Sequence, residues 1–259
     1  MAHNKKKPAP SNSTMSLGDH LEDLRHRVIL ALAGVVVAMV LCLIIGKYII
    51  AFVEKPYVIA MGEEARLQSL APADGFTSFM NLSMIASVVI SSPWIFYQLW
   101  MFISAGLYPH EKRYVYMAVP FSAALFIIGA LFFVFVIAPL TIRFLVMFNK
   151  DVLGVASNFT FKDYISFINI MMLIFGLAFQ TPIAIFFLIR MGLISIKTFN
   201  KSRPFVIFGV VVVSAFATPG DMISLFTLSI ALYLLFELGI ILGYFANRKQ
   251  NIIQADTNN

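Results

Sequence analysis

Charged residues and cysteines are both scarce in this sequence. Only 12% of its 259 residues are Asp, Glu, Lys or Arg, whereas 60% are hydrophobic and the mean hydropathy is +0.86. Soluble domains carry about 25% charged residues, so this composition excludes both a soluble globular fold and a disordered chain. The single cysteine, Cys42, lies inside an apolar run, which excludes an intrachain disulfide and a cysteine-based metal centre. The class that remains is an integral membrane protein.

Sequence motifs of the common catalytic and nucleotide-binding sites are also missing. The chain contains no G-x-x-x-x-G-K-[ST], H-E-x-x-H, G-x-S-x-G or G-x-G-x-x-G. The net charge of +6 is spread over the termini and short loops, so no basic face for nucleic acid is expected. The four histidines show no metal-ligand spacing: His3, His20, His26 and His110. The sequence therefore predicts no enzyme, no cofactor, no metal site and no nucleic-acid partner.

Long uncharged stretches are what the sequence has in abundance. A helix needs roughly 20 apolar residues to cross about 30 Å of hydrocarbon, and six stretches meet or approach this length. We expect an all-α polytopic membrane protein with one six-helix membrane domain over residues 16–247. A disordered basic tail, 1–15, precedes it, and a polar cytoplasmic tail, 248–259, follows. The predicted spans are about 28–46, 76–98 with a kink at Pro93, 114–138, 164–189, 204–217 and 222–245.

The fifth predicted span is short. It offers about 14 residues before Thr218-Pro219-Gly220-Asp221, or about 21 Å at 1.5 Å per residue. The turn residues predict a tight helical hairpin between spans five and six, with Pro219 and Asp221 as a structural cap. We expect the bilayer to be locally deformed around this span.

The distribution of Lys and Arg predicts the orientation, since cytoplasmic loops carry the excess. Thirteen of these residues lie on the side of the two termini and six on the other side, so both termini are expected in the cytoplasm. The two longer outer loops, about 47–75 and 143–163, contain prolines and acidic residues and are expected to be structured caps. The six Lys and Arg residues predicted on the outer side are Lys47, Lys55, Arg66, Arg143, Lys150 and Lys162.

The segment before the first span has two interpretations. Leucines and a valine recur at intervals of 4, 3 and 4 residues, which makes one apolar helical stripe after Ser16, a plausible N-cap. The segment is then either an interfacial helix on the cytoplasmic leaflet or a docking surface that offers carboxylates. The stripe is Leu17, Leu21, Leu24 and Val28, and the charged residues beside it are Glu22, Asp23, Arg25 and Arg27.

The segment 91–113, between the second and third spans, is rich in aromatic residues. Trp94, Tyr97, Trp100, Phe102 and Tyr108 are typical of an interfacial aromatic belt. A belt does not account for Glu111, an acid that follows an uncharged run on the basic side of the membrane. Glu111 is either part of a solvated charge cluster with its basic neighbours or a functional carboxylate.

Two polar side chains are predicted within the spans, where such groups are costly unless they are paired or hydrated. Gln180 lies ten residues before Arg190, and an amide at this depth favours an interhelical hydrogen bond. Glu237 lies eleven residues before Arg248, and its carboxyl must be protonated, paired or exposed to a water-filled cavity. We expect Glu237 to be functional.

Together these motifs resemble the TatC family, the membrane subunit of the twin-arginine protein translocase. The resemblance runs from about Leu17 to Asn247. It depends on His20-Leu21 to Leu24-Arg25, S-P-W-I-F-Y-Q-L-W-M-F-I-S-A-G-L-Y-P-H-E-K-R, F-G-L-A-F-Q-T-P, T-P-G-D and L-F-E-L-G. It implies a concave, glove-like fold with short fifth and sixth helices in the bacterial cytoplasmic membrane. It also implies recognition of paired-arginine signal peptides and export of folded proteins with TatA- and TatB-type partners, driven by the proton-motive force, with self-association in the complex.

The resemblance also implies roles for individual residues. Where the family has glutamate before Leu-Arg, this chain has Asp23 with a second acid at Glu22, and either could meet the peptide. Gln180 stands where glutamate is common, so it keeps hydrogen bonding but loses an ionisable group. The implied signal-peptide site is His20, Leu21, Glu22, Asp23, Leu24, Arg25, Phe102, Leu107, Tyr108 and Glu111, and the implied groove or partner surface is Phe175, Gln180, Pro182 and Glu237.

Two other functions are compatible with the composition. A small-solute secondary transporter would use Gln180 and Glu237 as a midplane substrate site. A membrane assembly scaffold would bind other subunits through its helix faces without touching a signal peptide. The ordered motifs favour the translocase over both.

Overall fold

The computed structural model describes residues 17–62, 67–106, 112–155, 159–194, 196–218 and 222–257. Within these residues the chain is helical apart from short connections and one isolated parallel bridge between Gln68 and Thr160. The helices are α1 (Leu17–Ile44), α2 (Gly46–Met61), α3 (Asp74–Ala105), α4 (Lys112–Phe132), the π-helical turn η1 (Phe133–Ile137), α5 (Ala138–Asp151), α6 (Phe161–Ala178), α7 (Thr181–Arg190), α8 (Ile196–Ala217) and α9 (Met222–Thr257).

Five helical segments of the described chain are long and apolar enough to cross a membrane. They are His20–Ile44, Asp74–Ala105, Lys112–Asp151, Phe161–Arg190 and Met222–Tyr244. The fifth predicted span, 204–217, lies in α8, which is not among the five. The first eight residues of α8 include Lys197, Lys201 and Arg203, so its apolar part is shorter than the others. The membrane class is thus confirmed with five apolar helices.

Several helices extend beyond the predicted boundaries of the spans. The segment before the first span is not a separate interfacial helix, because α1 is continuous from Leu17 to Ile44. The second span continues past Pro93 to Ala105 instead of ending at 98. The last helix, α9, continues to Thr257, so most of the predicted polar tail is helical.

The third span is extended by a π-helical turn. Residues Lys112–Asp151 form one helical segment of 40 residues, well beyond the predicted end at 138. Pro139 has no N–H to donate and would break a regular helix at this point. In the turn before it, the N–H of Ala138 donates to the carbonyl of Phe133, five residues back. This wider spacing accommodates Pro139 while the helix continues.

The fourth span is interrupted where the sequence predicted one helix over 164–189. Helix α6 ends at Ala178 and α7 begins at Thr181. Pro182 follows at the start of α7, where a missing N–H costs nothing. Its ring is incompatible with a continued helix because it would clash with the carbonyl of Ala178.

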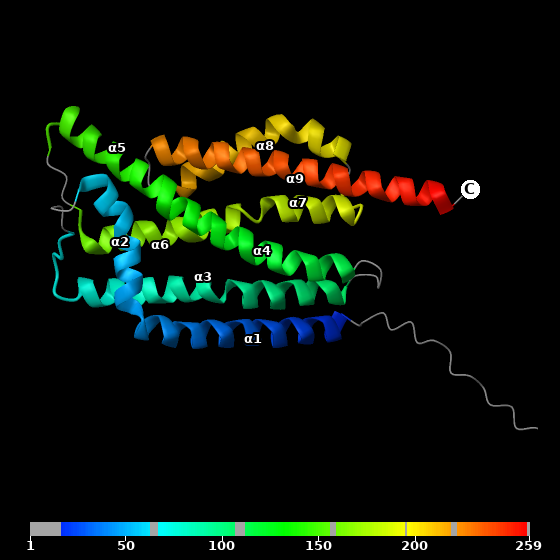
Figure 1. The fold of residues 1–259 in the computed structure, drawn as a ribbon, viewed down its shortest axis with the longest axis horizontal. Coiled ribbons are helices and arrows are strands. Elements are labelled where there is room, and N and C mark those ends of the chain that lie inside the picture. Colours follow the sequence, from blue (N-terminus) through cyan, green and yellow to red (C-terminus); the bar gives the residue numbers. More distant parts are fainter. Residues whose placement is uncertain are drawn as a thin grey trace, which may run out of the picture.

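The helices pack in two groups (Figure 1). Helix α3 packs on α1, α4 and α6, whereas α7 packs on α9, and α9 packs on α8. The largest hydrophobic core lies in the first group and contains the fully buried residues Phe133, Ile168 and Phe175. Two smaller cores join α3, α4 and α7 around Trp100, and α7 and α9 around Ile240.

The described residues of the two longer loops predicted on the outer side are structured, as expected, and the two loops also contact each other. Helix α2 lies across the end of α1 and α3 (Figure 1). The N–H of Gln68 donates to the carbonyl of Phe159 at 3.2 Å, and the N–H of Phe161 donates to the carbonyl of Gln68 at 2.8 Å. The Tyr164 hydroxyl donates to the carbonyl of Val53 at 2.5 Å. These bonds tie α2 and the segment after it to the start of α6.

Candidate functional site

The amino-terminal end of α1 meets the carboxyl end of α3. The rings of His20 and Phe102 stack with centroids 4.5 Å apart and planes 23° apart. Further along the same seam, Trp94 Nε1 donates to the carbonyl of Leu30 at 2.9 Å. Trp94 also lies against Gly34, where an added Cβ would come within 2.3 Å of its ring. The sequence placed His20 and Phe102 in one site, and the structure brings them together.

The helical geometry of α1 determines which of the two acids, Glu22 or Asp23, lies on the same side of the helix as His20. At 100° per residue, Asp23 lies about 60° from the direction of His20 and Arg27 about 20° from it. Glu22 lies about 160° away, on the opposite side of the helix. Asp23 is half-buried and Glu22 is exposed. The face of α1 next to Phe102 therefore carries Asp23.

Asp23 forms an ion pair within α1. Arg27 Nε donates to both carboxylate oxygens, at 2.8 Å to Oδ2 and 3.0 Å to Oδ1. The side chains of Asp23 and Arg27 keep 25% and 22% of their exposure, respectively. In the part of the chain that the structure describes, Glu22 and Arg25 are exposed and take part in no ion pair.

Several predicted residues lie outside the described residues. These are Leu107, Tyr108 and Glu111 of the predicted signal-peptide site, Pro219 and Asp221 of the predicted cap, and Ser16. The gap that contains Glu111 is flanked by Gly106 at the end of α3 and Lys112 at the start of α4.

The structure corrects one member of the predicted aromatic belt, Trp100. Trp94 and Tyr97 are exposed and stack with centroids 5.7 Å apart. Trp100 is buried instead, because its ring packs on Phe187 at 4.3 Å and its Nε1 donates to Ser122 Oγ at 2.8 Å. Trp100 thus connects α3 to α4 and α7.

Gln180 makes the interhelical hydrogen bond that its residue type favoured. It precedes α7, and its Nε2 donates to the carbonyl of Ser122 in α4 at 2.9 Å. The Ser122 side chain accepts from Trp100 at the same place. The amide therefore ties the α6–α7 break to the middle of α4.

Glu237 is paired, which was one of the three alternatives. Arg203 Nη2 donates to Glu237 Oε2 at 2.8 Å, and the Tyr233 hydroxyl donates to Oε1 at 2.9 Å. Sequence reasoning missed Arg203, because only the register of α8 against α9 brings it to Glu237. Glu237 bonds to α8, whereas Gln180 bonds to α4. The structure therefore does not bring the two side chains together.

The remaining predicted groove residues, Pro182 and Phe175, are buried. Pro182 packs against α9, where a Cβ added to Gly239 would lie 3.0 Å from its Cα. Phe175 has no exposed surface and packs on Phe132 and Phe133 in the largest core. A role for either in a groove stays a prediction.

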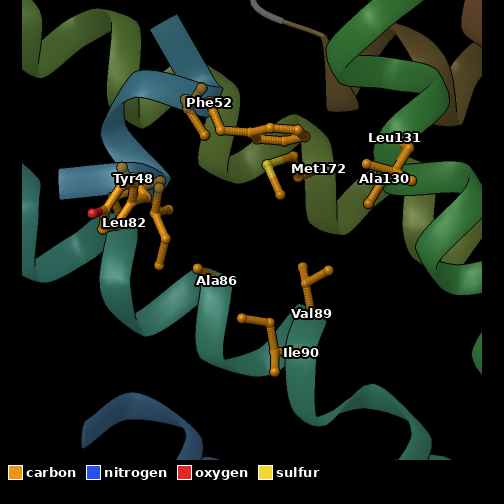
Figure 2. A pocket seen from close by; sticks show the side chains of 11 residues that line it. Tyr48, Phe52, Leu82, Ala86, Val89, Ile90, Ala130, Leu131 and Met172 are labelled. Atoms are coloured by element: carbon orange, nitrogen blue, oxygen red, sulfur yellow. The ribbon is translucent and has the colours of Figure 1, made fainter. Parts of the chain in front are cut away.

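Two apolar cavities open elsewhere. One of about 240 Å³ lies between α2, α3, α4 and α6 and is lined by side chains such as Phe52, Val89 and Met172 (Figure 2). The other, of about 230 Å³, lies between α4, α7 and α9 beside Tyr114. Among the described residues, no cluster of His, Cys, Asp or Glu could hold a metal ion.

Comparisons with known proteins identify relatives along most of the chain. The family described as Sec-independent protein translocase protein (TatC) matches residues 19–231. The Sec-independent protein translocase protein TatC of Helicobacter pylori is 36% identical over 234 residues, covering 89% of this chain and 88% of the relative. The protein of the same name from Escherichia coli is 33% identical over 232 residues, covering 90% and 89%.

A solved structure shares the fold. A crystal structure of the twin arginine translocase receptor TatC superposes with a TM-score of 0.76 at 31% sequence identity, covering 88% of this chain and 99% of that chain. A second crystal structure of that receptor, in DDM, gives a TM-score of 0.77 and covers 86% and 99%.

Proposed function

The chain belongs to the TatC family of Sec-independent protein translocase proteins, and we propose that it is the receptor subunit of a twin-arginine translocation system. A member of this family is a transport protein, not an enzyme. In this proposal the chain binds signal peptides that carry paired arginines. With TatA- and TatB-type single-span partners it exports folded proteins, driven by the proton-motive force. Family membership favours this function over a small-solute carrier.

The proposal includes a six-span topology in the bacterial cytoplasmic membrane. Helix α8 is the fifth span, with its apolar part in the membrane and Lys197 and Lys201 toward the cytoplasmic surface. Both termini are then cytoplasmic, in agreement with the excess of Lys and Arg on that side. The amino-terminal end of α1 and the carboxyl end of α3 also face the cytoplasm, where signal peptides arrive.

The stacking of His20 on Phe102 is the observation that carries the proposal. It brings the amino-terminal segment and the end of α3, which flanks the segment of Glu111, to one place on the molecule. Asp23 lies on this side of α1 and Glu22 on the other. We therefore assign the first peptide-binding carboxylate to Asp23 and the second to Glu111.

Carboxylates suit this task because the planar guanidinium of arginine can donate two parallel hydrogen bonds to one carboxylate. Lysine offers a point charge without this geometry and is expected to substitute poorly. Phe102 supplies a ring on which a guanidinium can stack. Leu24, the exposed residue directly after Asp23, offers apolar surface to the residues that follow the arginines.

The groove residues have supporting roles in this proposal. Gln180 and Glu237 hold α7 and α8 in register with α4 and α9 through their hydrogen bonds. Partner subunits and further copies of the chain would contact the helix faces beyond these bonds. The chain alone is expected not to transport, and export of a folded cargo by the pure chain in liposomes would contradict this.

Binding of a fluorescent paired-arginine signal peptide to the full chain in detergent tests the proposal. The paired-arginine peptide is expected to bind more tightly than its paired-lysine version. Asp23→Asn and Glu111→Ala are each expected to weaken it about 10-fold or more, since each removes a charge-assisted hydrogen bond.

Glu22→Gln is the matched control for Asp23→Asn. It removes one negative charge from the neighbouring position on the far side of α1, and the peptide affinity is expected to stay close to that of the wild type. Equal losses for Glu22→Gln and Asp23→Asn would contradict the assignment to Asp23. Equal binding of the two peptides by all variants would contradict the receptor function.

A further inference from the structure

Arg27 occupies the carboxylate that the proposed function assigns to the signal peptide. All hydrogen bonds that the structure gives between these two side chains come from Arg27 Nε, at 2.8 Å and 3.0 Å to the two oxygens of Asp23. One nitrogen thus serves both oxygens, instead of two nitrogens donating in parallel as in the strongest arginine–carboxylate pairs. A guanidinium that donates two parallel hydrogen bonds could therefore bind Asp23 more strongly than Arg27 does.

The pair is built into α1 by its sequence. Asp23 and Arg27 are four residues apart with the acid on the amino-terminal side, which is the favourable order on a helix. Both lie on the side of α1 that carries His20, next to Phe102. Each keeps about a quarter of its side-chain exposure, so a ligand can reach the carboxylate.

We propose that Arg27 is an internal stand-in for a signal-peptide arginine. It neutralises and orients Asp23 when no peptide is bound, and it releases Asp23 when a peptide guanidinium arrives. This inference rests on the proposed function. The exchange replaces one guanidinium by another, so the charge at Asp23 is unchanged, while the incoming group can make two parallel bonds where Arg27 makes bonds from Nε alone.

Competition of this kind has a specific signature. Every ligand that takes Asp23 must first displace Arg27, so paired-arginine and paired-lysine peptides are weakened by the same factor. Arg27 therefore sets the affinity of the site and leaves the preference for arginine to the carboxylate. Since helical ion pairs with this exposure contribute little free energy, the factor is expected to be about two- to fivefold.

Titration of the full-length chain in detergent with the two fluorescent peptides tests the inference. Arg27→Gln is expected to tighten both peptides by about two- to fivefold, with an unchanged ratio between them. Arg27→Lys keeps the charge but lacks the Nε donor, so a smaller gain is expected, and it provides a second variant if the first does not fold. Unchanged or weaker binding by the folded Arg27 variants would overturn the inference.

Two controls distinguish displacement of Arg27 from a general effect of positive charge. Lys201→Gln removes one exposed positive charge from α8, which the proposed topology places at the cytoplasmic surface, so an equal gain there would trace the effect to net charge and overturn the inference. In an Asp23→Asn background, Arg27→Gln is expected to give no gain in peptide affinity, and a gain there would also overturn the inference.

The single variant Asp23→Asn distinguishes failure of the proposed site from failure of this inference. If Asp23→Asn alone leaves the affinity unchanged, the proposed site itself is wrong. If Asp23→Asn weakens peptide binding while Arg27→Gln does not tighten it, the proposed site remains valid and only the role of Arg27 is wrong.

Discussion

Ser122 is a residue at which three helical segments are held together. Its hydroxyl accepts from Trp100 of α3, and its carbonyl accepts from Gln180 at the break between α6 and α7. Hydrogen bonds between neutral groups typically contribute about 1 kcal/mol each. At this position they also satisfy polar groups that lipid could not.

Gln180→Glu is expected to lose the bond to Ser122 at neutral pH, because an ionised carboxylate has no proton to donate. The unfolding temperature in detergent should fall at pH 7 and recover as the pH is lowered, once the carboxyl is protonated. Gln180→Leu, which cannot donate at any pH, is the control and should be destabilised by about 1–2 kcal/mol throughout. Identical pH profiles for the two variants would contradict this role of the amide.

From the partly buried Glu54 in helix α2 we predict a pH dependence of stability. Burial raises the pKa of Glu54 above its ordinary value of 4.5. The folded state therefore binds this proton more strongly than the unfolded state, and the associated stability is present below pH 4.5 and is lost as the pH rises through the raised pKa. Glu54→Gln removes the titration.

The unfolding temperature of Glu54→Gln relative to the wild type, measured between about pH 4 and pH 8, checks this expectation. The variant should gain on the wild type as the pH rises. A constant difference over the range would show that Glu54 ionises equally easily in the folded and unfolded chain.

At the scale of the helices, close packing at glycines fixes how α4, α6, α7 and α9 approach. A Cβ added at Gly129 of α4 would lie 2.6 Å from the backbone carbonyl of Phe175 in α6. Between α7 and α9, Cβ atoms added at Gly239 and Gly243 would collide with Ile185 and Ile189. Small residues at such crossings allow the backbones to pack closely where lipid gives no hydrophobic driving force.

Gly129→Ala is expected to destabilise the chain by about 2 kcal/mol, because the obstructing atom belongs to backbone that cannot rotate away. Gly209→Ala in α8 is the matched control, since an added Cβ there meets nothing within 4 Å. It should be neutral or stabilising by up to about 1 kcal/mol, as alanine favours a helix over glycine. Thermal unfolding in detergent compares the two, and equal stability would show that α4 and α6 can separate without cost.

For the molecule as a whole, apolar runs and charge placement were sufficient to predict an all-helical membrane protein. They could not predict how helices meet: the pairing of Arg203 with Glu237 depends on the register of α8 against α9. Two local features were missed, although the sequence alone was sufficient to predict them. Pro182 indicates the end of α6 at Ala178, and the spacing of Asp23 and Arg27 indicates an ion pair within one helix.

The long helix of residues 112–151 connects the two packing groups. By helical rise it is about 60 Å long. Among the described residues, hydrogen bonds at three places along it reach the α7–α9 group: Arg190 to Tyr114, Gln180 to Ser122, and Thr141 with Ser224. These anchor points lie about 12 Å and then about 28 Å apart along the axis. Because these bonds lie at three heights, α7–α9 cannot slide along the long helix without breaking all of them. The packing of Trp100 on Phe187 also holds α7 against α3, so α7–α9 is restrained against rotation about the long helix as well.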